Sequence, residues 1–383
     1  PQPRRLHPGC LMPRTPSPDE DDDLDRIPAP KPVHYAEQAL LGALLLEPHR
    51  LADTHPIKAG HFESHTHAAL FTAIQALTPP EHAEHATKPA WLNMVLDKAR
   101  PHAPGLSASY LHSLVQFCPN PKHAAAYARM IRADHARRAL RLHAERLAAA
   151  ATDPTLPHPA DTVLARADAL GRLLDDLAGQ YAPHSNPLPR TSPPATSVRQ
   201  ASEEDLDEER DLLASATAMP AEVRHMRWLA PNDFVLPLHA ALWQCLTTLV
   251  HRGDVVDPVT VLGEAQHHGL ITDTLTPRDV MAHISTPAGS PEYWGERVLQ
   301  RALLSRAHQV AETITAYTDD PANTPHQLIT GSRRALADLH ILRTRWHRAT
   351  APAPSPTART TARLSAPSAR AGPSTRPPAH VRR

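Results

Sequence analysis

Two stretches of this 383-residue chain match each other without a gap at an offset of 172 residues. The shared residues pair as Glu37 with Glu209, Leu40 with Leu212, Leu41 with Leu213, Pro48 with Pro220, Phe62 with Phe234, His67 with His239, Ala68 with Ala240, Ala69 with Ala241, Leu70 with Leu242 and Leu77 with Leu249. Ala and Leu are common here, but a His-Ala-Ala-Leu run before an aromatic residue is harder to obtain by chance. A repeat at a fixed offset indicates duplication, so we predict two copies of one folded unit.

Prolines divide the chain around these two copies. The 42 prolines gather near the ends and in one central segment, and a proline inside a helix removes a hydrogen bond and clashes with the preceding turn. We predict a disordered Pro-rich arm over residues 1–33, acidic from Asp19 to Asp25, a linker over 181–201 and a disordered basic tail over 348–383. The two copies then occupy residues 34–180 and 202–347.

The periodicity inside each copy is helical, and aromatic residues make up only 4% of the chain. Residues 35–46 and 66–77 space their apolar side chains three and four apart, and Ser202 with Asp205 resembles a capping box. Long helices over 124–150 and about 299–317 precede shorter ones over 160–177 and 327–342, which would fold back as hairpins. We therefore predict an all-α protein of two tandem helical bundles, each followed by a helical hairpin.

A set of short motifs recurs in order through both copies. The first copy holds Glu37, the Leu41-Gly42 step, Phe62, His67 and Tyr127 at the start of its long helix. The second holds Phe234, His239, the Asp257-Pro258-Val259-Thr260 helix start and Trp294, but has Ala214 where the Leu-Gly step would fall. The first copy lacks the Asp-Pro-Val-Thr element. This order resembles the N-terminal domain of DnaB-type replicative DNA helicases, present here as two diverged tandem copies.

In that family the domain forms a collar by pairing hairpins and offers a platform to primase and loading factors. The resemblance therefore implies a DNA-replication assembly or adaptor protein that binds a replicative helicase or primase, with self-association possible. Two such domains in one polypeptide would imitate a collar dimer. The alternatives are a DNA-binding accessory protein and a helical scaffold unrelated to replication.

The sequence does not contain the phosphate-binding loop of a helicase motor. That loop needs a Gly-Lys pair, because its amides cradle the phosphates while the lysine reaches the terminal ones, and none of the 13 glycines is followed by lysine. We therefore expect no enzyme activity and no cofactor. No apolar run is long enough for a membrane span, and three distant cysteines argue against a disulfide framework and favour a reducing cytoplasm. The resemblance implies that this cytoplasm is bacterial.

Histidine pairs are the only candidate metal ligands. His65 with His67, and His82 with His85, have suitable spacing, but no nearby cysteine and no convincing carboxylate completes a four-ligand set. Because the chain has 27 histidines, we predict structural or solvated roles and no metal site.

Two further surfaces are candidates for binding. An arginine-rich stretch of the first long helix could contact DNA phosphates, although the same arginines could cover a solvated helix face, the interpretation we favour. These residues are Arg129, Arg132, Arg137, Arg138 and Arg141. An apolar stripe on the second long helix is longer than a small bundle needs and is the predicted protein interface. It comprises Leu299, Leu303, Val310, Ile314 and Tyr317.

Overall fold

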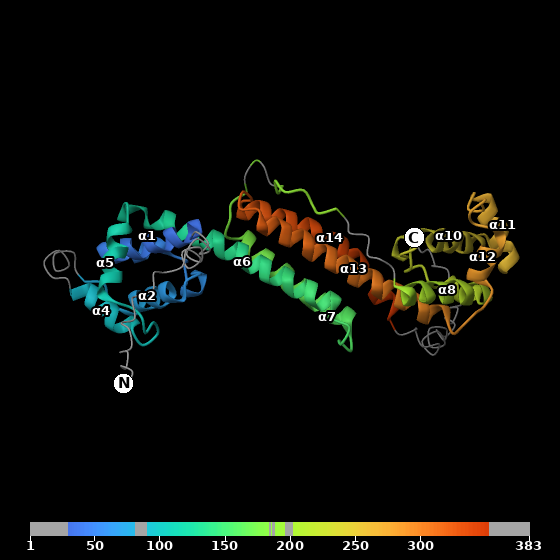
Figure 1. Cartoon of the computed structure of the whole chain (residues 1–383), viewed down its shortest axis with the longest axis horizontal. Helices are drawn as coiled ribbons and strands as arrows, with labels where there is room; N and C mark the ends of the chain where they lie inside the picture. Colours follow the sequence, from blue (N-terminus) through green and yellow to red (C-terminus); the bar gives the residue numbers. More distant parts are fainter. Residues whose placement is uncertain (1–29, 81–89, 184, 186–187, 196–201, 352–383) are drawn as a thin grey trace, which may run out of the picture. The chain divides into compact units, whose positions relative to one another are not determined.

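The computed structural model describes residues 30–80, 90–183, 185, 188–195 and 202–351. Every regular element in these ranges is a helix, which confirms the predicted all-α class (Figure 1). Most of the predicted arm and tail, part of the linker, and the His82 and His85 pair lie outside the described residues.

The chain forms two compact units, which are described separately. The first unit contains residues 1–198 and 304–339, and the second contains 199–303 and 340–383. Two long helices, α13 (Pro291–Asp319) and α14 (Pro325–Ala349), therefore contribute residues to both units. The predicted domain limits, 34–180 and 202–347, follow the sequence repeat and stay a prediction.

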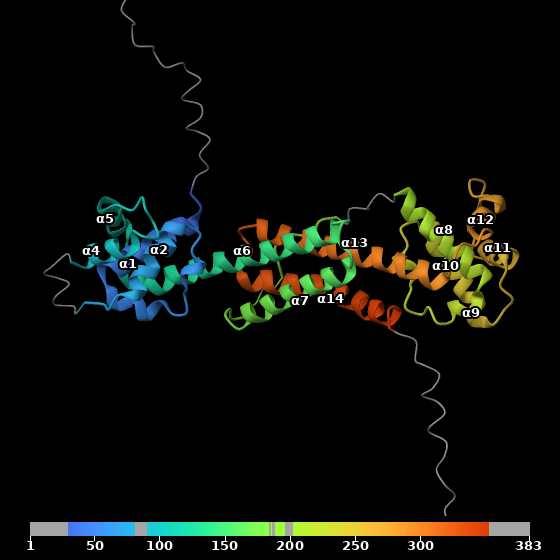
Figure 2. The ribbon, with the colours of Figure 1, turned by 90° about the horizontal axis from the view of Figure 1, so that it is seen from below.

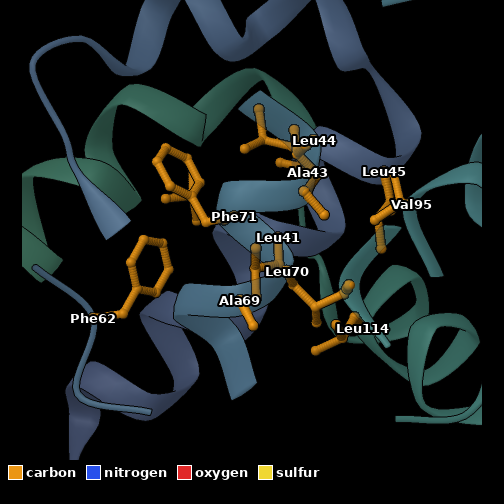
Figure 3. Packing of buried hydrophobic residues seen from close by; sticks show 14 of the residues in the cluster. Leu41, Ala43, Leu44, Leu45, Phe62, Ala69, Leu70, Phe71, Val95 and Leu114 are labelled. Carbon is orange, nitrogen blue, oxygen red and sulfur yellow. The ribbon is translucent and has the colours of Figure 1, made fainter. Parts of the chain in front are cut away.

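The first copy begins with a small bundle in the first unit. Its elements are α1 (Pro32–Leu46), η2 (Pro48–Thr54), η3 (Ala59–His61), α2 (His65–Ala76), α4 (Ala90–Ala99), α5 (Ala108–Phe117) and η4 (Pro121–His123). Ser64 and Ser107 cap α2 and α5 by accepting hydrogen bonds from amides of the first turn. Fully buried aliphatic and aromatic side chains fill the space between these helices (Figure 3).

A helical hairpin follows the bundle in the same unit. It consists of α6 (Ala124–Thr152) and α7 (Pro159–Ala178), and the views of Figures 1 and 2 both show the unit's portions of α13 and α14 alongside it. Arg333 Nη2 of α14 donates to Asp175 Oδ1 of α7 at 2.5 Å. The hairpin of the first copy thus packs with much of the hairpin of the second.

The second unit holds the bundle of the second copy. Its elements are α8 (Glu203–Ala218), α9 (Pro220–Val223), η5 (Pro231–Asp233), α10 (Pro237–Arg252), α11 (Pro258–His267) and α12 (Pro277–Ile284). The capping box at α8 is confirmed, because the Asp205 amide donates to Ser202 Oγ at 3.1 Å and the Ser202 amide donates to Asp205 Oδ2 at 3.0 Å. Gly253 ends α10 with a positive φ of 79°, a conformation that favours glycine.

The duplication extends into the long helices. Both α6 and α13 contain 29 residues, and they align at an offset of 167, from Ala124 to Pro291. All eight buried positions of α6 fall on buried positions of α13. The pairs are Ala124 with Pro291, Ala128 with Gly295, Ile131 with Val298, Ala136 with Leu303, Leu140 with Ala307, Ala144 with Ala311, Leu147 with Ile314 and Ala150 with Tyr317. The repeat is therefore one of packing as well as of sequence.

Candidate functional site

A carboxylate and an imidazole form a buried pair in the first copy. Glu37 on α1 and His67 on α2 are both fully buried, and Glu37 Oε2 lies 2.6 Å from His67 Nδ1. The other carboxylate oxygen accepts the Glu63 amide at 2.5 Å, just before α2 begins. His67 Nε2 lies 2.7 Å from the Tyr110 hydroxyl on α5. The Glu37–His67 pair thus joins α1, α2 and α5. Burial raises the pKa of the Tyr110 hydroxyl.

The second copy builds the same pair 172 residues later. Glu209 Oε2 lies 2.8 Å from His239 Nδ1, and Glu209 Oε1 accepts the Val235 amide at 2.7 Å. The third partner differs, since His239 Nε2 lies 3.2 Å from His283 Nδ1 near the end of α12. Burial, and then the charges of His239 and Arg210, lower the pKa of His283.

An ion network surrounds the pair of the second copy. Arg301 on α13 is 7% exposed, and its Nη2 donates to Glu209 Oε1 at 2.5 Å while its Nη1 donates to Glu208 Oε2 at 3.1 Å. The same Nη1 donates to the Asp205 carbonyl at 3.0 Å. Because a buried carboxylate without a partner is costly, this guanidinium compensates the acidic first turns of α8. The aligned residue in the first copy is Asp134.

Both pairs brace the fold. Each lies beneath the surface and ties the amides that precede a helix to a neighbouring helix, so neither imidazole is open to a substrate. His65, the partner considered for a metal, is exposed while His67 is buried, so the two side chains point to different environments.

The remaining family-signature residues take up packing and capping positions. Phe62 lies 5.0 Å from Phe71 between ring centroids, and Phe234 lies 5.8 Å from Trp243 in the corresponding place. Asp257 and Thr260 cap α11 reciprocally, through Thr260 N to Asp257 Oδ1 at 2.8 Å and Asp257 N to Thr260 Oγ1 at 2.9 Å. Leu41 is fully buried, Tyr127 is half-buried, and the Trp294 indole donates to the Ala288 carbonyl.

Gly42 lies where two helices cross closely. A Cβ at this position would meet the Leu114 carbonyl oxygen of α5 at 2.1 Å and the Cys118 Cβ at 2.9 Å. Only glycine fits such an approach. The second copy accommodates a Cβ at the corresponding position, because Ala214 stands there with 4% of its surface exposed.

Four of the five arginines considered as candidate DNA contacts bind atoms of the first unit itself. Arg137 donates to the carbonyls of Thr318, Asp320, Pro321 and Asn323 at 3.0, 2.6, 3.2 and 2.6 Å. Arg132 donates to Gln180, Arg138 to Asp134 and the His61 carbonyl, and Arg141 to Glu145 and Asp319. Arg129 is exposed. A role in DNA contact stays a prediction, and the contacts to the α13–α14 turn were not anticipated.

The predicted interface stripe is buried within the chain. Leu299, Leu303 and Ile314 are fully buried, while Val310 is 4% and Tyr317 7% exposed. Val310, Ile314 and Tyr317 belong to the first unit, and Leu299 and Leu303 belong to the second. Another protein would reach these side chains only by separating helices of this chain.

Sequence reasoning missed the roles of four residues of this site. Tyr110 and His283 complete the two pairs from different positions on their helices, so the repeat does not align them. Arg137 was considered only as a positive charge, whereas its acceptors are main-chain carbonyls. Every residue has such a carbonyl, so residue types do not identify these acceptors. Arg301 carried only a weak signal, namely an arginine within a long Leu-rich helix of the same copy as the acidic helix that begins at Glu203.

Known families account for these shared features. The family model of the DnaB-like helicase N terminal domain matches residues 29–133 and 201–296, more than half of the chain. No curated protein and no solved structure matches the chain. Among the described helices, none is both long and apolar enough to cross a membrane. The chain therefore belongs to the DnaB-like helicase N terminal domain family and carries that domain in two tandem copies.

Proposed function

We propose that this chain is a non-catalytic assembly or adaptor protein of DNA replication, whose paired collar-type domains bind a replicative helicase or a primase. The family match supports a replication-related role, and it covers only the domain that precedes the helicase motor. The sequence given contains no Gly-Lys pair with which to hold a nucleotide phosphate.

The observation that carries the proposal is the internal pairing of the hairpins. Arg137 of the first hairpin donates to four main-chain carbonyls at the end of α13 and in the turn that follows it, and charge-assisted hydrogen bonds of this kind are strong. Asn323 in that turn is 1% exposed and donates to the Tyr317 carbonyl at 2.9 Å. One polypeptide thus supplies both members of a hairpin pair, so the proposed partner binds its outer surface.

The DNA-binding alternative receives less support from the same helix. Arg132, Arg137, Arg138 and Arg141 donate to groups of the chain, and each would have to leave them to reach a phosphate. The basic tail over 348–383, the other feature behind this alternative, lies almost wholly outside the described residues.

The test is co-purification with the replicative helicase and the primase of the same host. We expect the full chain to retain at least one of them, and Arg137→Leu to weaken retention because it disturbs the hairpin pair. Arg146→Leu is the matched control, since it removes the same charge from an exposed position of α6. Retention of neither protein, together with salt-sensitive DNA binding, would favour the accessory-protein alternative instead.

A further inference from the structure

An apolar pocket opens on the first copy, between α1 and the start of α6. Its volume is about 290 Å³, and none of its lining residues is charged. Three large side chains around it remain well exposed, namely Tyr35 at 55%, Phe117 at 59% and Met130 at 49%. Contiguous apolar surface of this kind marks a binding site in a soluble protein.

The pocket is a property of the first copy and not of the fold. At the positions that align with Tyr35 and Met130, the second copy has Asp207 and Arg297. Arg297 donates to Glu208 Oε1 through Nε at 2.7 Å, so charge occupies the place of the apolar wall. Because the shared fold tolerates this exchange, the bundle does not need exposed apolar residues there to be stable.

The chain's own N-terminal segment reaches the edge of the pocket. The described residues begin at Pro30, and Pro32 already lines the pocket. Leu24 and Ile27 are the nearest preceding large apolar residues. Ile27 stands three residues before Pro30, and three extended residues span about 10 Å, so its side chain can reach the lining near Pro32.

Charge favours the same occupant. Residues 19–25 carry six acidic side chains, interrupted only by Leu24. Lys122 of η4 and Arg129 of α6 are exposed cations close in sequence to the lining residues Pro119 and Met130. We infer that residues 19–29 bind this pocket in cis, with Leu24 and Ile27 against its apolar lining and the acidic run toward Lys122 and Arg129.

Disulfide trapping in the full-length chain tests the inference. In a background with Cys10, Cys118 and Cys245 changed to Ser, Pro28→Cys and Gln38→Cys place one thiol beside Ile27 and one on the pocket lining. We expect a disulfide within one chain under mild oxidation. Adding Leu24→Ser and Ile27→Ser should slow its formation about tenfold, since the tether is unchanged and only the apolar contact is lost.

A matched control and a charge test accompany this comparison. Leu6→Ser with Leu11→Ser removes two apolar side chains outside the proposed segment and should leave the rate unchanged. Lys122→Gln with Arg129→Gln should slow trapping by a few-fold and make it less sensitive to salt. Helicity by circular dichroism checks that each variant remains folded.

Three results would overturn the inference. These are trapping that does not depend on Leu24 and Ile27, trapping that depends on Leu6 and Leu11 instead, and disulfides that join two chains. The last result would assign the pocket to a second copy of the protein. Hydrogen exchange gives an independent measure, because Leu24→Ser with Ile27→Ser should raise exchange in α1 and at the start of α6 but leave α8 and α10 unchanged.

Discussion

The two copies place the same buried carboxylate–imidazole pair in different electrostatic surroundings. His67 Nε2 meets the hydroxyl of Tyr110, whereas Glu209 and His239 face His283 and the guanidinium of Arg301. The pair itself fixes one local geometry, an α-helix start held by a neighbouring helix. The residues that compensate the buried carboxylate come from other helices, and they differ between the two copies.

The helix crossing at Gly42 also differs between the two copies. The first copy brings the α5 main chain so close to α1 that no Cβ fits, and the second copy carries Ala214 in the aligned place. The helices of the second bundle therefore leave more room at this point. A shared fold does not impose a shared distance between its helices.

Removing Arg301 should produce the largest difference between the copies. Arg301→Met leaves the fully buried Glu209 without its guanidinium, and we expect a loss of about 3–5 kcal/mol in the free energy of unfolding of the second bundle. Asp134→Ala, at the aligned position, removes an i,i+4 pair with Arg138 and should cost about 1 kcal/mol or less. Urea unfolding with peptide-resolved hydrogen exchange measures both, and equal losses would contradict the contrast.

The helix crossing gives the second largest effect. Gly42→Ala forces a Cβ against the Leu114 carbonyl, and overpacking of this kind costs about 1–3 kcal/mol. The reverse change in the other copy, Ala214→Gly, should cost about 1 kcal/mol through helix propensity alone. Thermal unfolding compares them, and an unaffected Gly42→Ala variant would mean that the two crossings are equally wide.

Loss of the third partner should have a smaller effect. Tyr110→Phe removes the hydroxyl beside His67 Nε2 while keeping the ring, and we expect a cost of about 1 kcal/mol. The same change should shift the imidazole resonances of His67 in NMR spectra but not those of His239. Simultaneous shifts of both histidines would show that the two pairs are coupled, contrary to their separate surroundings.

The smallest expected difference between the copies is in the pH dependence of their stability. Burial, followed by His135 and nearby cations, lowers the pKa of His61 from 6.5 to about 4. Because the unfolded chain takes up this proton first, the stability of the first copy should fall as the pH drops from about 7 toward 4. His61→Gln should flatten that dependence, as measured by urea unfolding across this range.

The aligned residue provides the opposing case. Asp233 occupies the position of His61, and burial raises its pKa despite the Arg345 guanidinium. The folded protein therefore binds a proton at Asp233 more tightly than the unfolded chain does. The contribution of Asp233 to stability increases as the pH falls through its raised pKa. Asp233→Asn should remove this opposing slope, and a pH dependence of the same sign at both positions would contradict the comparison.

Periodicity and motif order were sufficient to predict the helices, the tandem copies and the family. Ser202 with Asp205 was recognisable as a cap because such contacts are local in sequence. The role of Arg137 was not predictable, since its acceptors lie more than 180 residues away and are main-chain carbonyls. The apolar stripe from Leu299 to Tyr317 was predicted to be a protein interface, and its side chains are buried within this chain. Periodicity shows that a stripe will be covered but not whether the covering residues belong to the same chain.

The contact of Arg137 with the α13–α14 turn has a consequence for symmetry. A two-fold pair of identical subunits makes every contact twice, so a substitution there changes both sides together. Here the residue of α13 aligned with Arg137 is Leu304, and the contact exists once. Each side of this contact can therefore change alone, so the two faces of the hairpin pair are free to diverge toward different ligands.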